Sequence, residues 1–330
     1  MSSIARYLPG VLLLIVVGLL ARVIETVVSI GSVLLLALVL GFVIGNTIGV
    51  PTRTGPGVET DTLWLEVGII LMGASITFEY IFDSSPYIFF ITIFTILLFL
   101  FIVETLSRLL FNLPAKVSSL LAAGASICGV SAVAAVSRSI GSSRQQVAYV
   151  AATVLLFDAV TLTVYPIFGR VLDLPATVYG IWVGSTMFST GPVAAAGFAY
   201  SDTSGEWAVL IKLFRNMLIG LIVVAYAYYY RRRQVSTVSS NTILLFWKSF
   251  PKFVIGFVVV ILFSNLVLSS SSVQSLTNAS NWLFLFAFAG LGLQLELAKF
   301  RDAGIIPAVV MGISLIIVSS FTLSALILLF

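Results

Sequence analysis

The sequence predicts an all-α polytopic membrane protein: about eleven transmembrane helices in a single integral membrane domain (residues 1–330), with an inverted repeat and two discontinuous core helices. Of the 330 residues, 60% are hydrophobic and 9% are charged, whereas charged residues make up roughly a quarter of a soluble domain. Residues 86–103 and 305–330 carry no charge, and about 20 apolar residues suffice for one helical crossing. Because membrane-barrel strands are only about 10 residues long, a helical bundle is expected.

The segments expected to cross the membrane follow one another along the whole chain. They are residues 8–28, 30–50, 61–82, 86–111, 115–137, 145–170, 176–200, 204–230, 246–268, 281–298 and 304–329. The basic cluster 231–233 marks the cytoplasmic side, since Lys and Arg collect in cytoplasmic loops. We therefore expect a multi-pass protein of the cell membrane with a cytoplasmic amino terminus. This topology leaves Arg138 and Arg144 on the outer side, against the same rule.

The composition argues against several other classes of protein. The chain has no histidine and one cysteine, Cys128, so neither a zinc or copper site nor an internal disulfide is expected. No cofactor is expected, and the sequence shows no catalytic motif of an intramembrane enzyme. The net charge of +4 comes from short loops that orient the chain, so no nucleic-acid partner is expected. The serine-rich stretch 269–275 is interpreted as a polar outer loop.

Two apolar segments resemble each other and indicate an internal repeat. Residues 71–82 (LMGASITFEYIF) are similar to 289–300 (AGLGLQLELAKF), with Gly73 matching Gly290 and Glu79 matching Glu296. In the expected topology these segments cross in opposite directions, which is typical of inverted-topology transporters. Chance similarity between two apolar helices is the alternative.

Small and polar residues interrupt two further segments at expected mid-membrane depth. The candidate substrate-binding residues there are Ser126, Cys128, Gly129 and Ser131 in 115–137, and Ser189, Thr190 and Gly191 in 176–200. Pro192 removes a helix hydrogen bond, and an unwound stretch would offer N–H groups and a positive dipole end to an anion. Close helix packing is the alternative. The topology runs both segments in the same direction, which an inverted repeat does not predict, so either one is re-entrant or the count of spans is off by one.

Three charged residues fall deep inside expected spans, where a charge costs several kcal/mol unless it is paired or solvated. They are Asp158, Lys212 and Arg215. Lys212 and Arg215 share one helical face and would supply positive charge to an anionic substrate, with Asp158 as their counter-ion or as a proton carrier. A structural salt bridge between Asp158 and either cation is the alternative.

Residues at the expected inner end of two spans have simpler interpretations. Glu104 and Arg108 are four residues apart and are expected to form a local ion pair. The tyrosines at 226 and 228–230 precede the basic cluster and are expected to anchor the helix at the membrane interface.

The motifs GASICGVSAVAAV (124–136), VAYVAATVLLFDAVTLTVYPIFG (147–169) and VAAAGFAYSDTSGEWAVLIKLFRNMLIG (193–220) resemble the YeiH-like family, which is named for a proposed sulfate export. The resemblance covers about residues 30 to 318. It implies a secondary transporter of the cation/proton antiporter and bile-acid symporter architecture, with panel helices, a mobile core and two discontinuous helices crossing at the site.

The sequence departs from the family pattern at two places. Where members commonly carry a histidine followed by an acid, this chain has Phe188 and Ser189. Asp158 stands where a small neutral residue is common. Any proton coupling that used the missing side chains would therefore need another group here.

The expected function is secondary active transport of a small anion, such as sulfate, a related oxyanion or an organosulfonate, by alternating access. A sodium/proton-type cation antiporter that uses Asp158, or an anion channel, is the alternative. The expected partners are the anion, a coupling ion (proton or sodium) and the lipid bilayer. A homodimer is one oligomeric state to consider.

Overall fold

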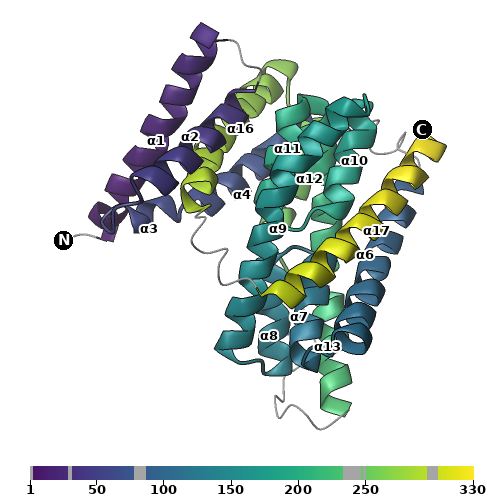
Figure 1. Cartoon of the computed structure of the whole chain (residues 1–330). Helices are drawn as coiled ribbons and strands as arrows, with labels where there is room; N and C mark the ends of the chain where they lie inside the picture. Colours follow the sequence, from purple (N-terminus) through teal and green to yellow (C-terminus); the bar gives the residue numbers. More distant parts are fainter. Residues whose placement is uncertain (1–2, 29–31, 78–86, 233–246, 248–249, 296–303) are drawn as a thin grey trace. The chain divides into compact units, whose positions relative to one another are not determined.

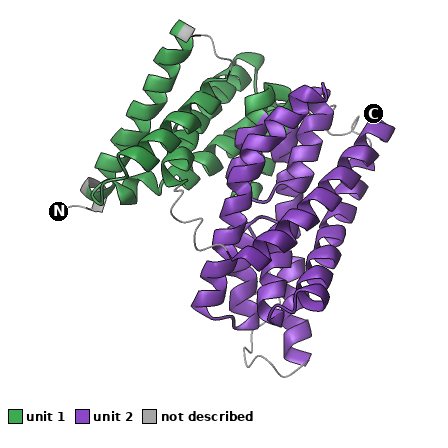
Figure 2. Cartoon of the chain, in the orientation of Figure 1, with its two compact units in different colours: residues 1–85, 198–206, 252–297 green, residues 86–197, 207–251, 298–330 purple. Residues whose placement is uncertain are grey.

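The computed structural model describes residues 3–28, 32–77, 87–232, 247, 250–295 and 304–330, and every regular element in these ranges is helical (Figure 1). This confirms the predicted all-α class. Six of the described helices are long and apolar enough to cross a membrane. The chain divides into two compact units, each assembled from three separate stretches (Figure 2). Unit 1 contains residues 1–85, 198–206 and 252–297, and unit 2 contains 86–197, 207–251 and 298–330.

Unit 1 is built around the long helix α16. Its helices are α1 (Ser3–Val28), α2 (Val33–Thr47), α3 (Gly55–Val58), α4 (Asp61–Met72) with the 3-10 turn η1 (Gly73–Ser75), α15 (Phe253–Leu266) and α16 (Ser270–Gln294). Helix α16 packs on α2 and α4, and α15 packs on α4. Glycines allow the backbones of α2 and α16 to touch, since a Cβ on Gly292 would lie 2.1 Å from the carbonyl oxygen of Leu38.

Two asparagines in unit 1 make reciprocal contacts that fit the predicted repeat. Asn46, near the end of α2, donates to the carbonyl of Leu295 just after α16 at 2.7 Å. Asn265, near the end of α15, donates to the carbonyl of Ile76 just after η1 at 2.9 Å. Asn46 therefore binds the middle of the segment 289–300, and Asn265 binds the corresponding part of the segment 71–82. Glu79 and Glu296 lie outside the described residues.

Unit 2 holds the segments that the sequence predicts to be interrupted. Its helices are α6 (Tyr87–Thr105) with the π-helical turn η2 (Leu106–Leu110), α7 (Ala115–Ser126), α8 (Val130–Ile140), α9 (Arg144–Val171), α10 (Ala176–Thr186), α11 (Thr190–Tyr200), α12 (Asp202–Met217), α13 (Ile219–Arg232) and α17 (Ile305–Leu329), with the ends of α11 and α12 around 198–206 belonging to unit 1. Helix α6 packs on α7, and α17 packs on α10.

The two interrupted segments differ from the prediction in one respect, because each turns back on itself instead of continuing in one direction. Lys116 at the start of α7 donates to the carbonyl of Gly141 just after α8, at 2.7 Å. Tyr179 in α10 likewise donates to the carbonyl of Ala196 in α11, at 3.2 Å. Figure 1 shows α7 and α8 at one end of α9, and α10 and α11 at its other end. The predicted spans 115–137 and 176–200 are therefore helical hairpins.

The lengths of the four helices that form the hairpins, referred to as limbs, explain how deep the hairpin tips lie. Each limb has 11 or 12 residues, or roughly 17 Å at 1.5 Å per residue. That is about half the hydrocarbon thickness of a bilayer. Two hairpins that enter from opposite ends of α9 therefore bring their tips together halfway along it.

The expected outer loop at 269–275 is wrong. The stretch forms the first turns of α16, because the hydroxyl of Ser269 accepts a hydrogen bond from the backbone N–H of Ser272 and caps the helix. Serine favours this position, so the same residues that indicate a loop also start a helix.

Candidate functional site

The tips of the two hairpins touch inside unit 2. Gly129, at the tip between α7 and α8, has a φ of +63° and a ψ of −132°, a conformation that only glycine adopts without strain. A Cβ at this position would lie 2.0 Å from Oγ of Ser189, at the tip between α10 and α11. The sequence thus places two predicted site residues on separate segments, and the structure brings them into contact.

Arg215 on α12 holds both tips through their carbonyl groups. It makes five hydrogen bonds: its Nε binds the carbonyl of Ser126 at 3.2 Å, Nη2 binds those of Ser126 at 2.8 Å and Ala125 at 3.0 Å, and Nη1 binds those of Met187 at 2.7 Å and Gly184 at 2.9 Å. A guanidinium has five N–H groups, so every one of them has a partner.

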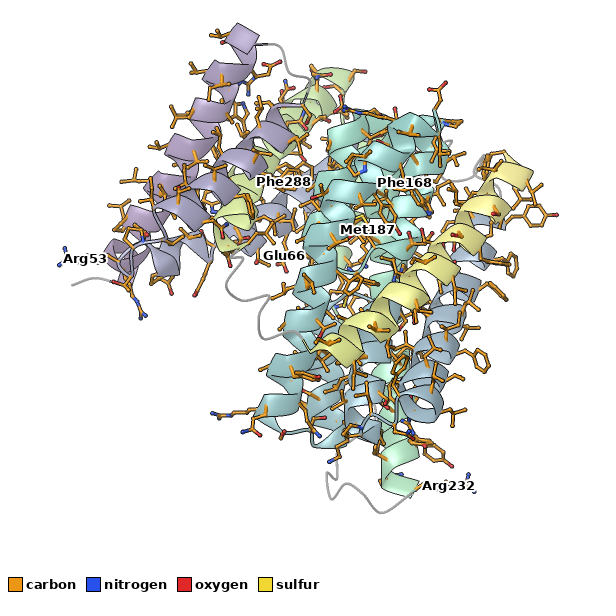
Figure 3. The ribbon with its side chains drawn as sticks, in the orientation of Figure 1. Arg53, Glu66, Phe168, Met187, Arg232 and Phe288 are labelled. Carbon is orange, nitrogen blue, oxygen red and sulfur yellow. The ribbon has the colours of Figure 1, made fainter. Side chains whose placement is uncertain are left out.

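Lys212 lies one helical turn before Arg215 and makes the same kind of contact. Its Nζ donates to the carbonyl of Ile127 at 2.8 Å, to that of Met187 at 3.0 Å, and to that of Phe188. Lys212 and Arg215 are both fully buried. Figure 3 labels Met187, whose carbonyl binds both cations, in the interior of unit 2.

These contacts change the role predicted for the two cations. Helices α7 and α10 both end at the tips, and a helix carboxyl end carries unpaired carbonyls and roughly half a negative charge. Lys212 and Arg215 neutralise those two ends and have no N–H left for direct contact with a substrate. Sequence reasoning missed this, since backbone carbonyls freed by a helix break carry no residue signature.

Asp158 on α9 binds the start of α11 instead of either cation. Its Oδ1 accepts a hydrogen bond from the backbone N–H of Ser189 at 2.9 Å, so it caps the positive end of that helix. Oδ2 has no hydrogen-bond partner among the described residues, although the side chain is 1% exposed. The alternative of a salt bridge between Asp158 and Lys212 or Arg215 does not occur in the described part of the chain. Among the residues that the structure describes, the ion pair found is that of Glu104 with Arg108.

Asn216 on α12 is a second buried polar residue that contacts the start of α11, and sequence reasoning did not select it. Its Nδ2 donates to Oγ1 of Thr190 at 3.1 Å, while its Oδ1 has no partner among the described residues. An asparagine next to Arg215 in an otherwise apolar span is a signal that could have identified it.

The remaining candidates divide into buried and accessible groups. Ser126 and Cys128 are buried. The hydroxyl of Ser126 donates a hydrogen bond to the carbonyl of Ala123, with 3.4 Å between the oxygens. The residues that begin α8 and α11 are partly or fully accessible. They are Val130, Ser131, Ser189, Thr190 and Gly191. The N-cap residue of α8 is Gly129, which offers no side-chain cap, and the positive amino-terminal end of a helix favours a bound anion.

Comparison with known proteins identifies the family. The family model described as "Conserved hypothetical protein 698" matches residues 9–311. The UPF0324 inner membrane protein YeiH of Salmonella typhimurium is 31% identical over 92% of this chain and 88% of its own length. YeiH of Escherichia coli K12 is 31% identical over 84% of this chain and 80% of its own. A UPF0324 membrane protein of Nitratidesulfovibrio vulgaris is 27% identical, over 92% and 88%.

The chain belongs to this UPF0324 family. The resemblance stated from the sequence motifs is therefore confirmed. Relatives in the UPF0324 family are called membrane proteins, and the YeiH relatives inner membrane proteins. Together with the six long apolar helices, this identifies the chain as a multi-pass membrane protein.

Proposed function

We propose that this chain is a secondary active transporter that carries a small anion by alternating access, with the anion bound at the adjoining amino-terminal ends of α8 and α11. One observation carries the proposal: Lys212 and Arg215 saturate the carbonyl ends at the hairpin tips, while the first residues of α8 and α11 remain at least partly exposed beside them. Irregular backbone at membrane depth is tolerated where it is buried in protein or lines a water-filled cavity. The ends of such interrupted helices bind substrates in transporters.

The charge of the site favours an anion. Each helix end counts as roughly half a charge, so the two amino ends and the two carboxyl ends at the tips cancel. The buried cations Lys212 and Arg215 then outnumber the buried acid Asp158. The balance is about +1 with Asp158 ionised, and about +2 with it protonated. A monovalent anion, or a divalent oxyanion together with a proton, would neutralise the site.

A second candidate function, cation antiport or cation coupling through Asp158, is favoured by two unpaired oxygens. Oδ2 of Asp158 and Oδ1 of Asn216 are both buried acceptors without a hydrogen-bond partner in the described residues, and both side chains contact the start of α11. Buried acceptors of this kind cost free energy unless a proton or a cation joins them.

Counterflow of labelled sulfate in proteoliposomes tests the proposal. We expect saturable exchange that unlabelled anions inhibit. In Asp158→Asn we expect exchange to persist but uptake driven by a proton or sodium gradient to be lost, whereas Asp173→Asn, an exposed acid in the same unit, should behave as wild type.

Two other results would contradict anion carriage. Anion flux without counterflow would identify a channel. Absence of exchange with every anion tested, together with sodium-driven proton flux that Asp158→Asn abolishes, would identify the cation antiporter.

The hairpins also revise the proposed topology. If neither hairpin crosses the membrane, the expected number of crossings falls from about eleven to about nine. Only the direction of α9 changes, so the amino terminus stays cytoplasmic in this proposal. Arg138 and Arg144 then lie in the cytoplasm, which removes their conflict with the positive-inside rule, and Arg170 moves outside beside Asp173.

Cysteine labelling in whole cells tests this topology directly. Gln145 and Leu172 are exposed at opposite ends of α9. With hairpins, Leu172→Cys should react with a membrane-impermeant maleimide in intact cells, and Gln145→Cys only after lysis. Two through-crossing segments predict the reverse result. The native Cys128 is 5% exposed, and a Cys128→Ser background excludes its contribution.

A further inference from the structure

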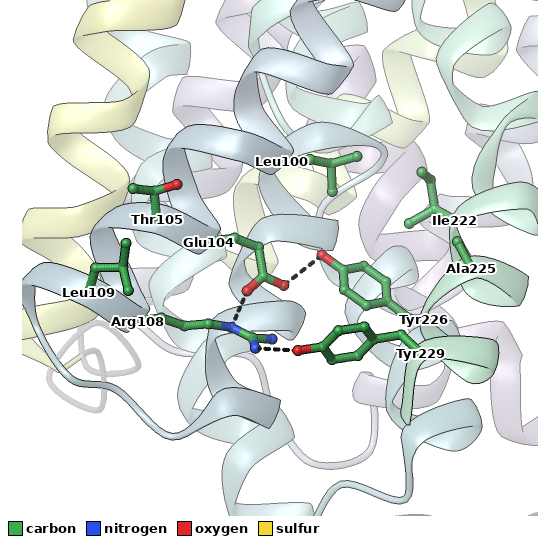
Figure 4. A pocket seen from close by; sticks show the side chains of 9 residues that line it. All are labelled: Leu100, Glu104, Thr105, Arg108, Leu109, Ile222, Ala225, Tyr226 and Tyr229. Carbon is green, nitrogen blue, oxygen red and sulfur yellow. Dashed lines mark hydrogen bonds and ion pairs between the residues drawn. The ribbon is translucent and has the colours of Figure 1, made fainter. Parts of the chain in front are cut away.

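A groove lies between α6 with its π-helical turn η2 and α13, away from the hairpin tips (Figure 4). Its volume is about 520 Å³, within the range of roughly 300–1,000 Å³ typical of ligand sites. Its lining surface is mostly apolar and includes Leu100, Leu109, Ile222 and Ala225. A π-helical turn is rare in proteins and often accompanies a functional site.

Four polar residues that also line the groove are bound to one another. Glu104 pairs with Arg108 and accepts a hydrogen bond from Tyr226 at 2.9 Å, while Arg108 donates to Tyr229 at 3.1 Å. Figure 4 shows these four side chains pointing toward one another. The predicted ion pair Glu104–Arg108 is confirmed. Because the charges of Glu104 and Arg108 cancel, this cluster is not itself expected to bind an anion.

Positive charge continues from the groove along α13. The lining residues Ile222, Ala225 and Tyr229 follow helical spacing, and the next residue on that face is Arg232. Arg232 is exposed, and Figure 3 shows it at the end of α13. Other basic residues lie at the helix ends on this side of unit 2. They are Lys116, Arg138, Arg144 and Arg231. Arg232 is thus an exposed cation about one helical turn beyond the lining residue Tyr229.

We propose that this groove binds an anionic glycerophospholipid, with an acyl chain between α6 and α13 and the phosphate at Arg232. The apolar lining matches a hydrocarbon chain, and the tyrosine hydroxyls lie between it and the basic end, as at a membrane interface. Basic pockets between membrane helices bind anionic headgroups, whereas a zwitterionic headgroup gains less from the same charge. A water-soluble phosphate ion would leave the apolar length of the groove unused.

Native mass spectrometry of the whole purified chain, delipidated in detergent, tests this proposal. The probes are phosphatidylglycerol and phosphatidylcholine with identical acyl chains. We expect the chain to bind one molecule of phosphatidylglycerol, and to bind it more tightly than phosphatidylcholine. Arg232→Gln should weaken its binding roughly fivefold, from about one kcal/mol per surface arginine. The matched control Arg231→Gln removes the same charge from a different helical face and should leave binding unchanged. Ala225→Phe, at an exposed lining position, should fill the groove and also reduce binding.

Three outcomes would overturn the proposal, each with the melting temperature of the variants unchanged. The first is equal retention of the two lipids, and the second is equal weakening by Arg231→Gln and Arg232→Gln, since both indicate nonspecific annular lipid. The third is displacement of the lipid by free inorganic phosphate, which would indicate a small-anion site.

Discussion

Replacement of Arg215 by leucine should destabilise the fold before it affects substrate recognition. The change removes the partner of three carbonyls from two different hairpins, those of Ala125, Ser126 and Gly184. The carbonyl of Met187 keeps its contact with Lys212. A buried acceptor left unpaired costs about 1–3 kcal/mol, so the total loss is expected to be at least about 3 kcal/mol. The measurement is the unfolding midpoint of the detergent-solubilised protein, together with its yield as a monodisperse peak.

Two further variants make this result interpretable. Arg138→Leu removes an exposed cation at the far end of α8 and should keep the stability of the wild type. Arg215→Lys keeps the charge but has three donors on one atom, so it should recover only part of the stability. A stable Arg215→Leu protein that has lost anion exchange would contradict this structural role. It would support direct contact between Arg215 and the substrate.

The Gly129→Ala variant should abolish transport and reduce stability by several kcal/mol. Two costs combine: a backbone at φ +63° and ψ −132° that alanine does not adopt without strain, about 1–3 kcal/mol, and a Cβ placed 2.0 Å from Oγ of Ser189. The hairpin tips must separate to admit the methyl group, and this displaces the starts of α8 and α11, where the anion is proposed to bind. The measurements are sulfate counterflow and thermal unfolding of the same preparation.

Gly49→Ala is the matched control for the backbone cost. Gly49 has a φ of +78° but no neighbour within 4 Å of an added Cβ. It should lose stability through strain alone and retain transport. Equal transport in Gly129→Ala and wild type would show that contact between the tips is not required for function.

Much of the fold follows from the sequence because the membrane restricts the alternatives. Long apolar runs in lipid must form helices, and small residues with proline at Gly191–Pro192 mark where a helix is interrupted. The direction after the interruption is not encoded in the same way. A hairpin and a through-crossing helix have the same apolar composition, and the difference depends on distant contacts such as Lys116 with Gly141.

Several candidate residues selected from the sequence lie close together in the structure, but the sequence does not give their hydrogen-bond partners. Gly129, Ser189, Asp158, Lys212 and Arg215 all meet at the hairpin tips. Deep charges draw attention because they are costly, but their cost can be met by backbone carbonyls as well as by a substrate. The sequence does not distinguish these two kinds of partner, because every residue contributes a backbone carbonyl. The structure does.

The contact between Lys212 and Ile127 has a consequence for biosynthesis. These residues are separated by 85 positions, so when α7 and α8 leave the ribosome, the side chain that satisfies their tip has not yet been made. The same holds for Arg215, which binds Ser126 across 89 positions. The tip of the first hairpin therefore gains these contacts only after α12 has been synthesised. Assembly of the tips is thus a late step, and a nascent chain that stops before residue 212 lacks both cations that close them.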